Sequence, residues 1–330
     1  MKTGVVLLNM GGPDCLAAVR PFLQNLFSDR DIIRLGPRPF QALLAWWIAK
    51  KRAPKSEKSY GLIGGKSPLL EITMSQARAV ERLLNDKGID ITAAAGMRYW
   101  SPRTPDVLKS LKEQGISSVA GLSLYPHYSR ATSGSSLADF SAACEDLGLL
   151  HIEIMAFPDY RPYIEALAEC LEDGLDALFR PEEKALLPHL PSDFALLYSA
   201  HSLPEYLIES GDPYVDNLRL TIEALEGMTG VRGELSFQSR SGPVKWLGPG
   251  TDTMILRFAK EGKKRILVVP ISFVSDHVET LYEIDMLYKD MAAEMGVRLV
   301  RAPSLNDRPA FIAALGMLVE DSFREIGWLG

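Results

Sequence analysis

The sequence has few cysteines and no long apolar run, and each absence excludes a class of protein. Three cysteines occur in 330 residues, Cys15, Cys144 and Cys170, with neither a CxxC pair nor the spacing of a zinc site. Free thiols in a reducing cytoplasm are the interpretation that fits. No apolar stretch approaches the roughly 20 residues that a spanning helix needs. The opening MKTGVVLLNMGGP holds too short an apolar run for a secretory signal and predicts a first strand instead.

Positive charge is outweighed by negative charge. The 36 Lys and Arg residues against 42 Asp and Glu give a net charge of −6, so the whole chain lacks the electrostatics of a nucleic-acid-binding protein. Familiar phosphate-binding signatures are absent too, because the turn 10–13 (MGGP) is neither a GxGxxG fingerprint nor a P-loop. This turn suits either a tight reversal of the chain or a loop whose backbone a ligand can approach.

What the sequence does contain is an alternation of strands and helices. Apolar residues make up 47% and charged residues 24% of the chain, as in globular proteins with a substantial core. The alternation predicts an α/β class with parallel sheets. Strands are expected at 4–9, 89–99, 118–125, 151–157, 194–199, 234–239, 266–269 and 297–301, and helices at 16–27, within 37–55, and at 69–87, 104–114, 137–147 and 308–326.

The length suits two domains of ordinary size or one large domain. We expect the change of domain near residue 150, because the run 151–157 begins a second set of strand–helix units. The first domain would then comprise residues 1–150 with a C-terminal helix of about 308–330, and the second residues 151–307.

An apolar helix is predicted early in the chain. Apolar residues fall on nearly every side of the segment Leu43–Ile48, which includes Trp46 and Trp47, and a basic cluster, Lys50–Arg52, follows. Such a helix lies either deep in a core or at an interface. Adjacent tryptophans beside basic residues also suit the surface of an anionic membrane. The sequence leaves both interpretations open.

Acidic side chains gather after a buried strand in the stretch Arg265–Tyr288. The strand 266–269 ends at Pro270, and Ser275 or Asp276 can cap the helix that follows. Asp276, Glu279 and Glu283 fall at i, i+3 and i+7, which is one face of an α-helix. A solvated acidic face explains this pattern, but the face also begins at the sheet edge where open α/β folds bind ligands.

A second polar stretch of the same kind leaves the strand 194–199. His201 follows that strand directly, in the sequence SAHSLP, and is either a structural histidine or a base or metal ligand. An imidazole that faces carboxylates can bind a divalent transition metal weakly. It can equally accept protons, because acidic neighbours raise its pKa. Trp246, in a loop rich in glycine and proline, and Phe273 could offer flat apolar walls to a ligand, although a structural role suits Trp246 equally.

Five segments in order resemble the ferrochelatase family. They are NMGGP at 9–13, LYPHYSRATSGSS at 124–136, SAHSLP at 199–204, KWLGPGTD at 245–252 and SDHVETLYEID at 275–285, and the similarity covers essentially the whole chain. The resemblance implies a chelatase-like fold, an α/β fold of two similar Rossmann-like domains with parallel sheets flanked by helices. It also implies a lyase of heme biosynthesis that inserts ferrous iron, its substrate, into a porphyrin.

The resemblance also assigns candidate site residues. His201 matches the active-site histidine of the family, and Glu279 matches its acidic partner; both would contact the metal. Asp276, His277 and Glu283 match a track that relays protons or metal. The porphyrin-binding positions are Met10, Arg98, Tyr99, Trp246 and Phe273. The segment Leu43–Ile48 resembles a lip that touches membrane in some members, so a cytoplasmic protein with peripheral membrane contact is expected.

Two departures from family patterns bear on substrate and cofactor. Some members hold an iron–sulfur cluster on cysteines near the C-terminus; no cysteine follows Cys170 here, so no cluster is expected. Members that use coproporphyrin III resemble this pattern with Tyr near Met10, so Met10 favours protoporphyrin IX as substrate and protoheme as product. The alternatives are a coproporphyrin III ferrochelatase, a cobalt or other tetrapyrrole chelatase on the same fold, and a non-catalytic porphyrin or heme carrier.

Overall fold

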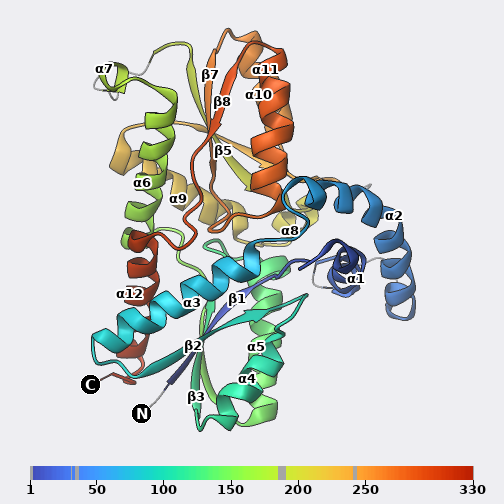
Figure 1. Cartoon of the computed structure of the whole chain (residues 1–330), viewed down its shortest axis with the longest axis vertical. Coiled ribbons are helices and arrows are strands. Elements are labelled where there is room, and N and C mark those ends of the chain that lie inside the picture. Colours follow the sequence, from blue (N-terminus) through green and yellow to red (C-terminus); the bar gives the residue numbers. More distant parts are fainter. Residues whose placement is uncertain (1–2, 31, 34–36, 185–190, 241–243, 330) are drawn as a thin grey trace. The chain divides into compact units, whose positions relative to one another are not determined.

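The chain folds into two compact units, each built on one parallel sheet flanked by helices (Figure 1). A computed structural model describes residues 3–30, 32–33, 37–184, 191–240 and 244–329. One unit joins Met1–Ala156 to Asn306–Gly330, and the other is Phe157–Leu305. The predicted α/β class with two similar Rossmann-like domains is confirmed.

The sheet of the first unit has the strand order β2-β1-β3-β4, and every neighbouring pair is parallel. The strands are β1 (Thr3–Asn9), β2 (Ile91–Met97), β3 (Ser118–Ser123) and β4 (Leu150–Ile154). One expectation is wrong here. The run 151–157 does not begin the second set of units, because it supplies β4, whose Leu150 lies opposite Ser118 of β3.

Most helices of the first unit bury apolar residues on one side. The helices of this unit are the 3-10 helices η1 (Leu16–Ala18) and η2 (Arg38–Phe40), the helices α1 (Val19–Ser28), α2 (Gln41–Leu62), α3 (Leu69–Asp86), α4 (Thr104–Glu113), α5 (Ser135–Leu147) and α12 (Pro309–Glu325), and the short π-helix η3 (Arg130–Gly134). The helix α2 continues past Pro54 to Leu62, beyond the predicted range, and the alanines Ala45, Ala49 and Ala53 along one side of it are buried. The C-terminal helix α12 packs on α3, where Lys87 pairs with Glu320 at 2.9 Å.

The second unit repeats the same sheet topology, β6-β5-β7-β8, again wholly parallel. Its strands are β5 (Phe194–His201), β6 (Glu234–Gln238), β7 (Arg265–Pro270) and β8 (Arg298–Arg301). Its α-helices are α6 (Arg161–Leu178), α7 (Pro181–Lys184), α8 (Glu205–Glu209), α9 (Tyr214–Thr229), α10 (Thr251–Lys260) and α11 (Lys289–Glu294). The uncharged runs predicted as buried strands are the central pair β5 and β7, as expected where helices cover both faces.

The helix after β7 differs from the expected α-helix. Residues Glu279–Tyr288 form a ten-residue π-helix, η4, which passes into α11. Backbone hydrogen bonds run from i to i+5 in a π-helix, so each turn is wider than in an α-helix. Asp276 precedes this helix, and the predicted i, i+3, i+7 face of one α-helix is therefore wrong.

Candidate active site

His201 is the last residue of β5 and lies at the carboxyl edge of the second sheet. Its backbone N–H donates to the hydroxyl of Ser272, which follows β7, at 2.9 Å. Its carbonyl accepts a hydrogen bond from the Tyr214 hydroxyl at 2.9 Å. These two bonds hold the backbone of His201, while 33% of its side chain stays exposed. A ligand can therefore reach the imidazole.

Glu279, the first residue of η4, faces this imidazole. The Nδ1 atom of His201 lies 2.8 Å from Oε2 of Glu279. The Nε2 atom of His277 lies 3.6 Å from the same oxygen. The carbonyl of Ser275, 3.0 Å from Nδ1 of His277, orients that second ring. Two imidazoles thus surround one carboxylate oxygen.

The pair of His201 and Glu279 shifts both pKa values. Burial acts to lower the pKa of His201, but the charge and hydrogen bond of Glu279, with the charge of Glu283, outweigh it and raise that pKa. Burial acts to raise the pKa of Glu279, but the charge and hydrogen bond of His201, with those of His277, hold it well below its usual range. The two groups therefore favour the ion pair of imidazolium and carboxylate.

Glu283 lies beside this pair and is held by the end of β6. The Ser239 hydroxyl and the Gln238 amide both donate to its Oε2, at 2.6 and 3.1 Å. Gln238 also donates to the carbonyl of Glu279 at 3.0 Å. Ser239 has a φ of 64°, a left-handed conformation that residues with side chains rarely adopt and that is concentrated at functional sites. Burial and the charge of Glu279 raise the pKa of Glu283.

Sequence reasoning did not assign Gln238 and Ser239 to the site. The available signal was their position, because they follow β6, and β6 pairs with β5 up to His201 opposite Gln238. Side chains at the carboxyl ends of neighbouring parallel strands meet at one edge of a sheet.

Asp276 lies in a second polar cluster on the same unit. Its Oδ1 accepts hydrogen bonds from Arg301 at 3.0 Å, Ser304 at 2.7 Å and Thr280 at 3.0 Å. Arg301 also binds Asp285. Of the three predicted relay residues, the structure therefore brings His277 and Glu283 to Glu279 and places Asp276 among the partners of Arg301.

Aromatic side chains adjoin His201. The ring of Phe273 meets that of His201 edge-on, with centroids 6.3 Å apart, and lies 4.4 Å from the ring of His277. The loop of Trp246 is hydrogen-bonded to the chain that follows His201, where the N–H of Leu247 donates to the carbonyl of Leu203 at 2.9 Å. The ring of Phe273 thus adjoins His201, and the Trp246 loop lies beside the chain that leaves it.

The other three predicted porphyrin-binding residues lie together in the first unit. Met10 and Tyr99 follow β1 and β2, and the N–H of Tyr99 donates to the carbonyl of Met10 at 2.9 Å. Arg98 pairs with Asp29 at 3.0 Å and with Asp139 at 3.1 Å. Tyr99 is only 5% exposed, and its hydroxyl donates to Asp29 at 2.8 Å. Burial, with the charge of Asp29, raises the pKa of Tyr99.

The backbone geometry of the turn after Met10 requires glycine at positions 11 and 12. Gly11 has a φ of 82°, and a Cβ on Gly12 would lie 2.5 Å from the side chain of Ser67. A left-handed backbone and a close approach both require glycine. The tight-turn interpretation therefore accounts for these two residues.

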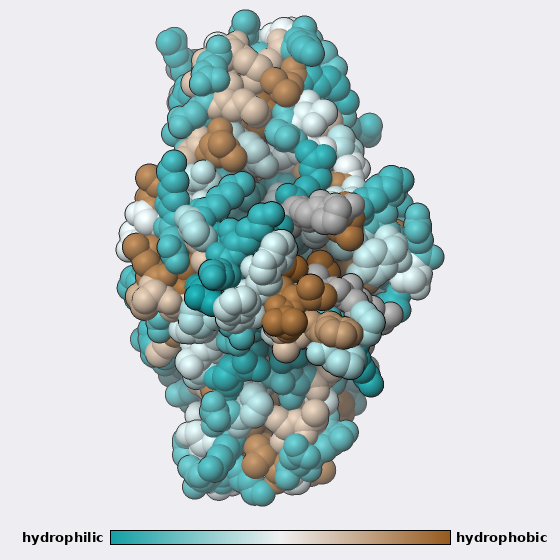
Figure 2. Space-filling view, turned by 90° about the vertical axis from the view of Figure 1, so that its right-hand side faces the viewer, coloured by the Kyte–Doolittle hydropathy of each residue, from teal (hydrophilic) through white to brown (hydrophobic). Residues whose placement is uncertain are grey.

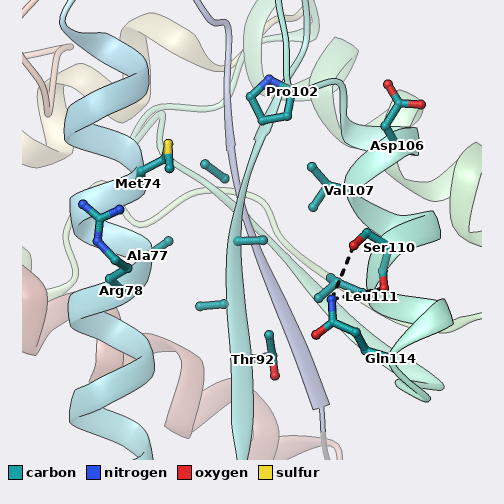
Figure 3. Close-up of a pocket in the computed structure, with 13 residues that line it drawn as sticks. Met74, Ala77, Arg78, Thr92, Pro102, Asp106, Val107, Ser110, Leu111 and Gln114 are labelled. Atoms are coloured by element: carbon teal, nitrogen blue, oxygen red, sulfur yellow. Dashed lines mark hydrogen bonds between the residues drawn. The ribbon is translucent and has the colours of Figure 1, made fainter.

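An open groove of about 480 Å³ runs along β2 in the first unit (Figure 3). Met74 and Arg78 of α3 form one wall, Asp106 and Val107 of α4 lie on the other, and alanines of β2 form the floor. Its thirteen lining residues include none of the predicted site residues.

The Ferrochelatase family model matches residues 2–323 of the chain. The chain belongs to the ferrochelatase family. A ferrochelatase of Desulfotalea psychrophila is 51% identical over 324 residues, which are 98% of each chain. A ferrochelatase of Aquifex aeolicus is 44% identical over 326 residues, which are 97% of this chain and 99% of that one. The chain is thus a ferrochelatase-type lyase of heme biosynthesis, and the family predicted from sequence is confirmed.

Solved structures also support the chelatase fold of this ferrochelatase-family chain. SirB from Bacillus subtilis with Fe³⁺ has a TM-score of 0.56 at 10% identity, covering 98% of this chain and 96% of that one. The sirohydrochlorin chelatase SirB from Bacillus subtilis subspecies spizizenii, in complex with cobalt, has a TM-score of 0.52 at 10% identity and covers 98% and 95%. At such low identity these likenesses concern the fold alone.

Proposed function

We propose that this enzyme inserts Fe²⁺ into protoporphyrin IX, with His201 and Glu279 at the reacting centre. The ring loses two pyrrole protons and gains one ferrous ion, so protoheme and two protons are the products. The observation that carries the proposal is the contact of 2.8 Å between His201 Nδ1 and Glu279 Oε2 at the carboxyl edge of the sheet.

His201 serves as the base and a ligand of the incoming iron. Metal insertion needs a group that removes pyrrole protons, and an imidazole is suited to this near neutral pH. Its partial exposure, 33% of the side chain, leaves it open to a porphyrin. The pKa of His201 is raised. Its neutral form, which accepts a proton, therefore predominates only when the pH is above this raised pKa.

Glu279 and Glu283 would guide iron inward and protons outward. Glu279 offers carboxylate oxygens to a ferrous ion. Because such ligands bind the ion weakly and leave coordination positions open, the ion can pass onward to the porphyrin ring. Glu283 holds a proton more readily than an ordinary carboxyl, since its pKa is raised. His277 supports Glu279 from the other side at 3.6 Å.

Aromatic and apolar side chains would bind the porphyrin. Phe273 and Trp246 provide flat surfaces beside His201, and Met10 provides a flexible thioether in the first unit. We assign Arg98 and Tyr99 of the first unit to porphyrin binding as well, because their hydrogen bonds to Asp29 fix the backbone next to Met10.

Met10 is the basis for choosing protoporphyrin IX over coproporphyrin III. Protoporphyrin carries two vinyl groups where coproporphyrin carries two further propionates. An apolar thioether suits a vinyl group, whereas a tyrosine hydroxyl can donate to a carboxylate.

An anaerobic assay tests the function and the substrate together. The enzyme is mixed with Fe²⁺ and either porphyrin, and loss of the free-base spectrum is followed. We expect turnover of protoporphyrin IX to exceed that of coproporphyrin III, and the variant Met10→Tyr to narrow the difference. The reverse preference would keep iron insertion and refute the choice of substrate. Tight porphyrin binding without turnover of either ring would indicate a carrier.

We further propose that α2 touches the surface of an anionic membrane. Its residues Leu43 and Trp47 are 63% and 54% exposed, which argues against the deep-core interpretation of this helix. Lys50 and Lys51 lie over the rings of Trp46 and Trp47. Figure 2 looks onto the side of the molecule that carries α2 in Figure 1, and hydrophobic atoms gather near the middle of that face. Among the described helices none is long and apolar enough to cross a bilayer.

A further inference from the structure

Arg301, the last residue of β8, binds two carboxylates that flank the active-site glutamates. Its Nε and Nη2 atoms donate to the two carboxylate oxygens of Asp285, at 2.9 and 2.7 Å. Its Nη1 atom donates to Oδ1 of Asp276 at 3.0 Å. The side chain of Arg301 is only 9% exposed and that of Asp276 19%, whereas that of Asp285 is 36% exposed. The contact with Asp276 is therefore the more buried of the two.

These two attachments enclose the functional part of η4. Asp276 precedes the helix and Asp285 lies within it, while Glu279 and Glu283 lie between them in sequence. The hydroxyl of Thr280 adds a bond of 3.0 Å to the same oxygen of Asp276. Arg301 therefore fixes the start and the middle of the helix to the end of one strand.

A π-helix needs such support more than an α-helix does. Helices of this type are rare and usually last a single turn, whereas η4 extends over ten residues. The planar fork of an arginine can hold two carboxylates in fixed directions, which a lysine ammonium cannot do. The position of Glu279 opposite His201 depends on how this helix is held.

We propose that Arg301 is a positioning residue that holds η4 in the geometry in which Glu279 contacts His201. Asp276, predicted as part of the relay, serves in this proposal as one of the two anchors. The inference rests on the proposed function for its effect on turnover, but its structural effect is measurable without turnover.

The unit contains a matched control, Arg265. This arginine also binds two carboxylates, Glu183 and Asp193, each at 2.7 Å, and is 18% exposed. It begins β7, at the opposite end of that strand from the loop that leads to η4. The variants Arg301→Met and Arg265→Met each remove one such bridge, and only the first touches η4.

The decisive measurement is the titration of His201 followed by NMR of the imidazole in the iron-free protein. The raised pKa of His201 depends on the nearby Glu279, so displacement of Glu279 lowers it. We expect Arg301→Met to lower this pKa and to reduce kcat by about 10- to 100-fold, as misplaced catalytic groups do. Arg265→Met should leave the titration unchanged and kcat within about twofold.

Two milder variants cover the case in which Arg301→Met does not fold. Arg301→Lys retains one ion pair and should give an intermediate shift. Asp285→Asn removes the bidentate contact alone and should shift His201 in the same direction, whereas Asp193→Asn should not. An unchanged His201 titration in the folded Arg301 variants, or equal shifts in the Arg265 variants, would overturn the proposal. Absence of iron insertion by the wild-type enzyme would refute the proposed function and leave the titration result intact.

Discussion

The charge on His201 is set by its neighbours more than by its burial. Glu279 and Glu283 stabilise the imidazolium, and this form cannot accept a proton. A base with a raised pKa works better as the pH increases, until it is fully neutral. The acid side of the pH–rate profile should therefore report His201 at a pH above its ordinary value of 6.5.

Replacement of Glu279 should move that acid limb. In Glu279→Gln the opposing charge is gone and burial remains, so the pKa of His201 should fall and the acid limb should shift to lower pH. The pH dependence of kcat/KM for the residual activity checks this. Asp216→Asn, on the exposed face of α9 in the same unit, is the control. An acid limb that stays in place would show that another group titrates there.

Replacement of His201 should stop the reaction without unfolding the enzyme. Loss of a positioned general base costs about 10²- to 10⁴-fold in rate, and loss of a metal contact adds to this. We expect His201→Ala to insert iron at a rate reduced at least this much, with an unaltered circular dichroism spectrum. His151→Ala, in β4 of the first unit, is the histidine control. Substantial turnover by His201→Ala would contradict the assignment.

The side of α2 that packs on the protein differs from the side that we propose to contact the membrane. Its buried side includes the small residues Ala45, Ala49 and Ala53, while Leu43 and Trp47 are exposed. Replacing Leu43 and Trp47 should therefore leave the packing of α2 against α1 intact, whereas the ring of Trp46 also lies beneath Arg20 of α1.

The double variant Leu43→Ser/Trp47→Ser should bind anionic vesicles several-fold more weakly, because the exposed apolar contact is lost while the basic residues remain. Vesicle co-sedimentation measures this binding, with neutral lipid as the comparison. Turnover of detergent-dispersed porphyrin should stay within about twofold. Equal sedimentation of wild type and variant would refute the membrane proposal.

Patterns along the chain predicted the strands better than the type of helix. The uncharged runs of β1, β5 and β7 identify central parallel strands, since few other elements are so uniformly apolar over so short a length. The spacing of apolar residues could not reveal that η4 is a π-helix. The change of backbone hydrogen bonds from i+4 to i+5 does not produce a distinct pattern of apolar and polar residues in so short a segment. The spacing also could not assign β4 to the first sheet, because a strand of either sheet would have the same pattern.

Sequence patterns predicted the residues of the candidate site that lie close after buried strands, but not the residues that hold them. His201 and Glu279 each follow a buried strand, and parallel strands deliver such residues to one edge. Their contact of 2.8 Å follows from the pairing of β5 with β7. The role of Arg301 could not be read from the sequence, since one arginine at the end of a strand is unremarkable until its partners are known.

The whole chain should carry no iron–sulfur cluster. It has three cysteines, the exposed Cys15 and the buried Cys144 and Cys170, and cluster ligation usually takes four thiolates. Protein purified without oxygen should lack acid-labile sulfide and the broad visible absorption of such clusters. Iron insertion should be equally fast in Cys15→Ser. A stoichiometric amount of sulfide would disprove this prediction.

The discontinuous first unit determines the order in which the two units can complete their folding during synthesis. That unit needs Asn306–Gly330, whereas the second unit is complete at Leu305. The helix α12 supplies Glu320, which pairs with Lys87 at the end of α3, and Asp307 accepts a hydrogen bond from Ser75 at 2.7 Å. Nascent domains ordinarily fold in order from the N-terminus.

In this chain the first unit starts to leave the ribosome before the second unit but is the last to be completed. A chain released at Leu305 should therefore keep the amide-exchange protection of β5 and β7 and lose much of it in β1 and β2, which hydrogen-exchange mass spectrometry can measure. Equal protection of both sheets in the shortened chain would contradict this. Until its last helix emerges, the N-terminal half of the enzyme exposes a face of α3 that chaperones can bind, so a stalled ribosome leaves the oldest part of the chain the most vulnerable.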